Sequence, residues 1–173
     1  VVTMQNVNTI GYGTSFAGAN VSANYNKQEG GGSAYSVGMD FAPTDNAMVF
    51  IATADEYAGT NATTDSITYG GTYTAGAITA GLQRSSIDSS TANADTDRTH
   101  LGASFAVNED LSLSWGMSTV EFEDGSLSDQ EDSGFSASYT MGSMSLTAAM
   151  NSQDNVSGAN GTDDELSLIH ISE

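Results

Sequence analysis

Apolar and polar residues alternate along most of this chain, in segments of about 8 to 11 residues, which is the length of a strand that crosses a membrane. Apolar side chains recur at every second position, as they do on one face of a β-strand. In one segment Phe135, Ala137 and Tyr139 alternate with Ser136 and Ser138. The pattern predicts strands over residues 8–16, 20–28, 34–41, 47–54, 66–74, 77–86, 100–107, 111–122, 134–141, 144–152 and 165–171.

Short and long connections alternate between these segments. The short ones, at 17–20, 43–46, 74–77, 108–110 and 142–143, are rich in Gly, Asn and Asp, which suit tight hairpin turns. The long ones are polar, at 55–65, 87–99, 123–133 and 153–164, with a shorter one at 30–32. The sequence therefore predicts an all-β fold, an antiparallel meander of about eleven strands that forms part of a transmembrane β-barrel.

Composition agrees with a membrane role that uses strands alone. The chain has 173 residues, of which 38% are hydrophobic, with 19 Gly, one Pro and no Cys. No apolar run approaches the roughly 18 to 20 residues of a membrane-spanning helix. The lack of Cys excludes disulfides and thiolate metal sites.

Charge excludes another class of function. Three basic residues against 22 acidic ones give a net charge of −19, which repels nucleic acid. Most acidic residues fall in the four long connections. Of the three cations, Lys27 is the candidate for the polar side of the sheet, whereas Arg84 shares a face with Leu82. We expect an acidic vestibule that favours cations.

The two sides of the predicted strands have different expected surroundings. The small polar side would line a water-filled pore, with Ser22, Asn24, Asn26, Lys27, Ser36, Asp40, Ser112, Ser114, Ser118, Ser136 and Ser138. Aromatic residues near the strand ends would form the girdles that mark membrane interfaces, namely Tyr12, Phe16, Tyr25, Tyr35, Phe41, Tyr69, Tyr73, Phe105, Phe135 and Tyr139. A soluble sandwich would instead bury the apolar sides against each other. Those sides mix Ala with single large residues, which suits lipid better than a core.

The remaining sequence motifs do not indicate a catalytic site. The string Thr9-Ile10-Gly11-Tyr12-Gly13 matches a potassium filter, but it lacks the helices that such a filter needs. His100 and His170 stand alone, and no catalytic arrangement is present, so we expect neither an enzyme nor a resident cofactor. The densest acidic loop is a candidate for weakly bound Ca²⁺, with Glu123, Asp124, Asp129, Glu131 and Asp132.

The segments Asn8–Phe16, Val21–Tyr25, Leu101–Phe105 and Leu111–Gly116 resemble strands of general Gram-negative porins of the alphaproteobacterial type. The resemblance covers most of the chain in pattern and matches best the C-terminal portion of those proteins. It implies a sixteen-stranded, homotrimeric barrel in the bacterial outer membrane. Such a barrel is in contact with the lipid bilayer and passes small hydrophilic solutes and ions by diffusion.

The chain departs from that family in two respects. Eleven strands is odd and too few, so residues 1–173 are expected to be one barrel domain fragment without its N-terminal strands and constriction loop. Residues 166–173 are either a native last strand or a non-native tail translated from an adapter sequence. The rival interpretation of the whole chain is a soluble extracellular adhesin or surface-layer module that calcium rigidifies.

Overall fold

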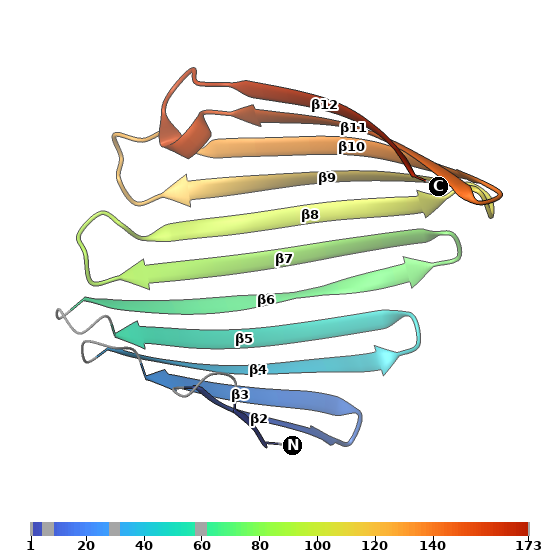
Figure 1. Ribbon diagram of the computed structural model, residues 1–173. Helices are drawn as coiled ribbons and strands as arrows, with labels where there is room; N and C mark the ends of the chain where they lie inside the picture. The colour runs from blue at the N-terminus through green and yellow to red at the C-terminus, as the bar shows by residue number, and fades with distance from the viewer. Residues whose placement is uncertain (1, 5–8, 28–31, 58–61, 173) are drawn as a thin grey trace. The chain divides into compact units, whose positions relative to one another are not determined.

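The chain folds into a meander of β-strands (Figure 1). A computed structural model describes residues 2–4, 9–27, 32–57 and 62–172. Within them are twelve strands, each next to its neighbours in sequence, and one 3-10 helix. Their bounds are β1 Val2–Met4, β2 Thr9–Phe16, β3 Ala19–Lys27, β4 Ser33–Thr44, β5 Ala47–Tyr57, β6 Thr63–Ala75, β7 Ile78–Ser89, β8 Thr96–Ala106, β9 Leu111–Phe122, β10 Gln130–Met141, β11 Met144–Asp154, η1 Val156–Gly158 and β12 Asp164–Ser172.

This order confirms the predicted all-β antiparallel meander. All eleven predicted strands are present, and β1 is added before them. No helix in the described part of the chain has the length and apolar character needed to cross a membrane. The connection at 28–31 and the middle of the first long loop, 58–61, lie outside the described residues.

The meander divides into two compact units. The first contains β1 to β5, β6 as far as Gly71, β7 from Gln83 and the start of β8. Its tight turns, 17–18 and 45–46, lie at one end of the strands (Figure 1). Ala17 and Gly18 both have positive φ, the geometry of a two-residue hairpin turn. Pro43 lies near the end of β4, at an irregularity in its pairing with β5 where a missing N–H is tolerated.

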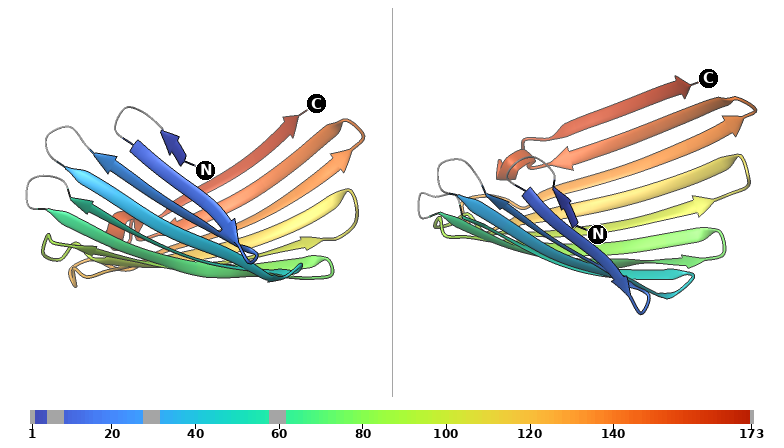
Figure 2. Two further views of the ribbon diagram at one scale, coloured as in Figure 1. Left: turned by 90° about the horizontal axis from the view of Figure 1, so that it is seen from below. Right: turned by 60° about the horizontal axis from the view of Figure 1, so that its bottom comes forward.

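The second unit contains the remainder of β6 to β8, together with β9 to β12. Its tight turns are 76–77, 107–110 and 142–143, and its long connections are the β9–β10 loop, 123–129, and the β11–β12 loop, 155–163. Figure 2 shows η1 at the end of β11, beside β10. The last strand does not alternate, because it carries apolar residues on both sides. Leu166 and Leu168, opposite Asn151 and Ala149 of β11, lie on one side, and Ile169 and Ile171 lie on the other.

The strands extend further into the predicted loops than the sequence indicates. β6 begins at Thr63 and β10 at Gln130, where the predicted starts were 66 and 134. Many acidic residues assigned to loops therefore lie on strand ends, which corrects that part of the sequence interpretation. The apolar alternation stops at these ends, but backbone pairing continues. The acidic residues concerned are Asp55, Glu56, Asp65, Asp88, Asp97, Glu131, Asp132, Asp154 and Asp164.

The described residues contain no buried hydrophobic side chain. Large apolar residues are instead exposed along the strands, from Phe16 at 79% to Phe41 at 36%. A water-soluble domain of this size would bury most of such residues in a core. Each unit therefore carries its apolar side chains on a surface and does not bury them within itself.

Candidate functional site

Small polar side chains share one face of the first unit, which we call the polar face. Asn24 pairs with Ser36, and Ser36 pairs with Ala54, so these three lie in one row across β3, β4 and β5. The next row toward the long connections is Asn26, Ala34 and Glu56. Residues directly opposite in an antiparallel sheet lie on the same face. The opposite face, which we call the apolar face, carries Tyr25, Tyr35, Val37, Met39 and Ile51 in the same strands.

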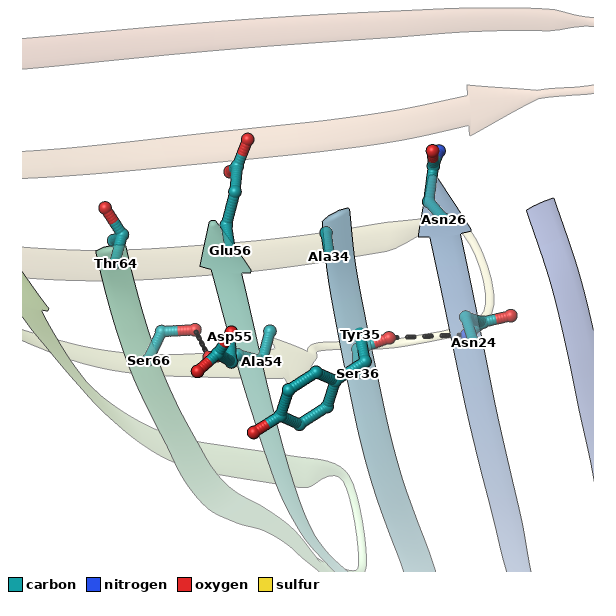
Figure 3. A pocket seen from close by; sticks show the side chains of 10 residues that line it. All are labelled: Asn24, Asn26, Ala34, Tyr35, Ser36, Ala54, Asp55, Glu56, Thr64 and Ser66. Atoms are coloured by element: carbon teal, nitrogen blue, oxygen red, sulfur yellow. Dashed lines mark hydrogen bonds between the residues drawn. The ribbon is translucent and has the colours of Figure 1, made fainter. Parts of the chain in front are cut away.

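These two rows border a shallow hollow of about 210 Å³ (Figure 3). Asn24 Nδ2 donates to Ser36 Oγ at 3.4 Å, and Ser66 Oγ donates to the Ala54 carbonyl at 3.5 Å. Figure 3 shows Asn26, Glu56 and Thr64 pointing the same way from their strands. Amide, hydroxyl and carboxylate groups thus form a hydrophilic wall at the long-connection end of β3 to β6.

A second polar row lies near the tight turns of this unit. Ser15 Oγ donates to Asn20 Oδ1 at 2.7 Å, and Asn20 Nδ2 donates to Asp40 Oδ2 at 2.8 Å. Gly13, Ser15, Asn20, Ser22 and Asp40 line a hollow there. The row holds the Asp40 carboxylate in a defined place on the polar face.

The second unit repeats this arrangement. Ser114 and Ser136 hydroxyls lie 2.7 Å apart, and those of Ser138 and Thr147 lie 3.3 Å apart. Ser118 Oγ donates to Asp132 Oδ2 at 2.8 Å. Hydrogen bonds therefore link small polar residues across β9, β10 and β11, on the side opposite Trp115, Met117, Phe135 and Leu146.

Most of the residues predicted to line the pore lie on the polar face of their unit. These are Ser22, Asn24, Asn26, Ser36, Asp40, Ser112, Ser114, Ser118, Ser136 and Ser138. Lys27 is the exception and corrects the prediction. It pairs with Ser33 and follows Tyr25 at the two-residue period of the apolar face. Its charge led to the wrong assignment, although Lys27 lies within the predicted strand 20–28, two residues after Tyr25.

The expected aromatic girdle residues follow the apolar face. All ten are exposed large side chains: Tyr12, Phe16, Tyr25, Tyr35, Phe41, Tyr69, Tyr73, Phe105, Phe135 and Tyr139. Tyr25 and Tyr35 are direct cross-strand partners, near the long-connection end of their strands. Exposure on one face is compatible with a lipid interface, and the girdle assignment itself stays a prediction.

The residues of the proposed calcium loop are not gathered into one cluster. In the described part of the chain no three His, Cys, Asp or Glu side chains could hold a metal ion together. Glu131 and Asp132 are adjacent in β10 and so project to opposite faces. Asp132 accepts hydrogen bonds from Ser118 and Gln130, whereas Asp124 accepts from Ser126. Strand alternation separates acids that are neighbours in sequence.

Asp124 should titrate at a lower pH than an ordinary aspartate. The Ser126 hydroxyl donates to Asp124 Oδ1 at 2.7 Å and the Ser126 N–H donates to the same oxygen at 2.9 Å, which lowers the pKa of this carboxyl. The resulting stabilisation of the β9–β10 loop is present above the unfolded-state pKa and is lost as pH falls through the lower folded-state pKa. We expect Ser126→Ala to raise the midpoint of a carboxyl-carbon NMR titration, and an unchanged midpoint would contradict the assignment.

The remaining cations lie on different sides of the sheet. Arg84 Nη2 forms an ion pair with Asp97 Oδ2 at 3.2 Å, with both side chains partly exposed. Arg84 alternates with Ser85, which is buried on the polar face against Thr68 at 2.9 Å, so the ion pair lies on the apolar side. Arg98 lies on the side of β8 opposite Leu101 and Phe105.

The sequence analysis does not assign three further residues to the polar face. Asn20 shares the alternation of Ser22 and Asn24, and that signal was available in the sequence. Phe50 had no such signal, because β5 is apolar on both sides, and only its pairing with Asp40 places it on the polar face. Gln130 was assigned to a loop, although it begins β10.

Comparison with known proteins supports the fold. No protein-family model matches the chain, and no curated protein sequence matches it. Among solved structures, an anion-selective porin from Comamonas acidovorans superposes with a TM-score of 0.78 at 15% identity, over 94% of this chain and 58% of that chain. Outer-membrane OmpT of Vibrio cholerae gives 0.69 at 15% identity, over 94% of this chain and 61% of that chain.

A third similar structure is the NanC porin, with a TM-score of 0.59 and 11% identity over 95% of this chain and 90% of that chain. The chain thus spans about three fifths of the first two proteins and most of the third. At these identities the similarity is one of fold. The strands have the arrangement found in the walls of outer-membrane porins.

Proposed function

We propose that this chain forms part of the wall of a water-filled β-barrel channel in a bacterial outer membrane, through which small hydrophilic solutes and ions diffuse passively. The observation that carries the proposal is the absence of any buried hydrophobic side chain among the described residues, while large apolar side chains project from one face. Lipid is the solvent in which that face is stable. The porin folds of the similar structures support the same assignment.

The polar face would then be the channel lining. Its serine and asparagine side chains already bond to one another, as Asn24 does to Ser36 and Ser114 to Ser136, so they offer a hydrated surface without strong ligand sites. Passage by diffusion requires no catalysis and no binding energy. Channel width and the electric field along the path would set which solutes pass.

The charge of the lining favours cations. Asp40 and Glu56 lie on the polar face of the first unit, and Asp132 lies on that of the second. Arg98 is a basic residue on the polar side of β8, opposite Leu101 and Phe105. The net charge of −19 adds a negative field at the long connections. The anion-selective porin therefore matches this chain in fold, and we propose the opposite ion preference for the channel formed here.

We further propose the homotrimeric state that the porin resemblance implies. The alternative, a soluble adhesin, gains no support from the structure, because it would leave residues such as Phe16, Tyr73 and Met141 in water. The exposed apolar face is the feature on which the two hypotheses differ most.

Reconstitution tests the channel proposal. We expect the full-length gene product to require detergent or lipid for folding and to make liposomes swell in small sugars. Unboiled electrophoresis or light scattering in detergent would report the trimer separately. A monodisperse, folded protein in plain buffer, with a melting temperature that Ca²⁺ raises, would reject the channel and favour the adhesin. Addition of EDTA to that sample provides the matched control for calcium.

A further inference from the structure

The β11–β12 loop does not extend away from the sheet but is fastened to the β9–β10 loop. The Ser128 N–H donates to the Gly158 carbonyl at 3.0 Å. Asn155 Nδ2 donates to the Asp129 carbonyl at 3.0 Å, and the Ser157 N–H donates to Gln130 Oε1 at 2.8 Å. Three hydrogen bonds thus join the two ends of the β10–β11 hairpin and the loops next to them.

Gly158 forms the apolar centre of this contact. It is buried and has a φ of +78°, which glycine adopts without strain. A Cβ at this position would come within 2.8 Å of Leu127 Cβ and 3.2 Å of Phe122 Cε2. Such distances leave no room for a side chain, so the close approach of the two loops depends on glycine.

The β11–β12 loop is also folded internally. The Val156 N–H donates to the Thr162 carbonyl at 2.8 Å, and the Gly161 N–H donates to Asn155 Oδ1 at 3.0 Å. Asn155 and Ser157 hold positive φ angles within it. A loop with these internal bonds keeps a defined shape, in contrast to a polar loop that is free in solvent.

The groups that hold the loop lie on the polar side of the sheet. Gln130 pairs with Val120, and both share the face of Ser118 and Asp132. Phe122 continues that face at the two-residue period. Because Gly158 contacts Phe122 and Ser157 bonds to Gln130, the loop crosses β10 on its polar side.

We propose that the β11–β12 loop is a fixed inward-folded element that sets the upper size limit for solutes at the long-loop mouth of the channel. The inference rests on the proposed channel function, since the polar side is the lumen only in a barrel. Gly158 is a positioning residue that lets the loop lie close to Leu127, and the folded segment 155–163 is the obstacle itself.

Two glycines in this loop provide a matched pair for the test. Gly158→Ala places a Cβ against Leu127, whereas Gly161→Ala introduces a Cβ that meets nothing within 4 Å, at a similarly positive φ of +73°. Both variants therefore impose backbone strain, and only the first pushes the loops apart. In liposome swelling, we expect Gly158→Ala to raise the rate for a trisaccharide severalfold relative to a pentose, and Gly161→Ala to keep the wild-type ratio.

Asn155→Gly gives a second test if Gly158→Ala fails to fold, because it keeps the positive φ while removing both the bond to the Asp129 carbonyl and the bond from the Gly161 N–H. We expect the same shift toward larger solutes. Unchanged ratios in folded Gly158→Ala and Asn155→Gly would overturn the inference while leaving the channel intact, and an equal shift in Gly161→Ala would also overturn it. A wild-type protein that passes not even the pentose would instead reject the channel proposal.

Discussion

Val37→Arg should destabilise the folded protein in lipid vesicles by about 2–4 kcal/mol, the cost of an arginine facing lipid near the middle of a barrel wall. Val37 is 44% exposed on the apolar face, in the interior of β4. Its direct partners are Ala23 and Thr53, which are too small to cover a guanidinium. Denaturant unfolding in vesicles, followed by Trp115 fluorescence, measures the free energy of unfolding.

Ser36→Arg is the control for this substitution. Ser36 precedes Val37 in the same strand but lies on the polar face, where an arginine would project toward water. We expect its free energy of unfolding to stay within about 0.5 kcal/mol of the wild type. A Val37→Arg protein as stable as the Ser36→Arg protein would contradict the assignment of the apolar face to lipid.

Asp40→Lys should lower the preference of the channel for cations. The carboxylate is held by Asn20 at 2.8 Å, which fixes its position on the polar face. A carboxylate about 4 Å from a passing cation favours it by about 1 kcal/mol in water, a factor of about five in local concentration. The substitution replaces that attraction with repulsion, so we expect the cation-to-anion permeability ratio to fall severalfold. Reversal potentials in a salt gradient across a planar bilayer report the ratio.

Asp45→Lys makes the same change of charge in the β4–β5 turn, a few residues from Asp40 and away from the polar row. We expect it to change the reversal potential much less, and the difference to shrink at high salt because screening shortens the range of both charges. Anion preference in the wild type would defeat the proposed role of the acidic lining. If Asp40→Lys and Asp45→Lys changed the reversal potential equally, the total charge of the protein, and not the position of Asp40 on the polar face, would set the ion selectivity.

The sequence predicts the strands well but places their ends poorly. Alternation identifies the central parts of β4 and β9, because a two-residue period appears only where one side meets an apolar environment. It does not find the start of β10 at Gln130, where both sides are polar. Backbone hydrogen bonds extend the strand there without any apolar signal, so loop lengths are overestimated and loop acids are assigned incorrectly.

The same reasoning explains which parts of the site could be anticipated. Rows of serine and asparagine indicate the polar face, but Phe50 is placed there only by its register with Asp40, which depends on the pairing partner. The contact between Gly158 and Leu127 joins two loops whose sequences carry no mutual pattern. Contacts of this kind depend on tertiary geometry, and the sequence alone offers no period from which to infer them.

The last strand has a practical consequence for handling the protein. β12 presents Leu166 and Leu168 on one side and Ile169 and Ile171 on the other, and within the described residues it pairs with β11 alone. A strand with apolar side chains on both faces has the composition of a segment that self-associates into fibrils when the chain is unfolded. Aggregation during refolding is therefore expected to involve the β12 segment before it pairs, and a charged residue placed within that segment would act as a gatekeeper against it.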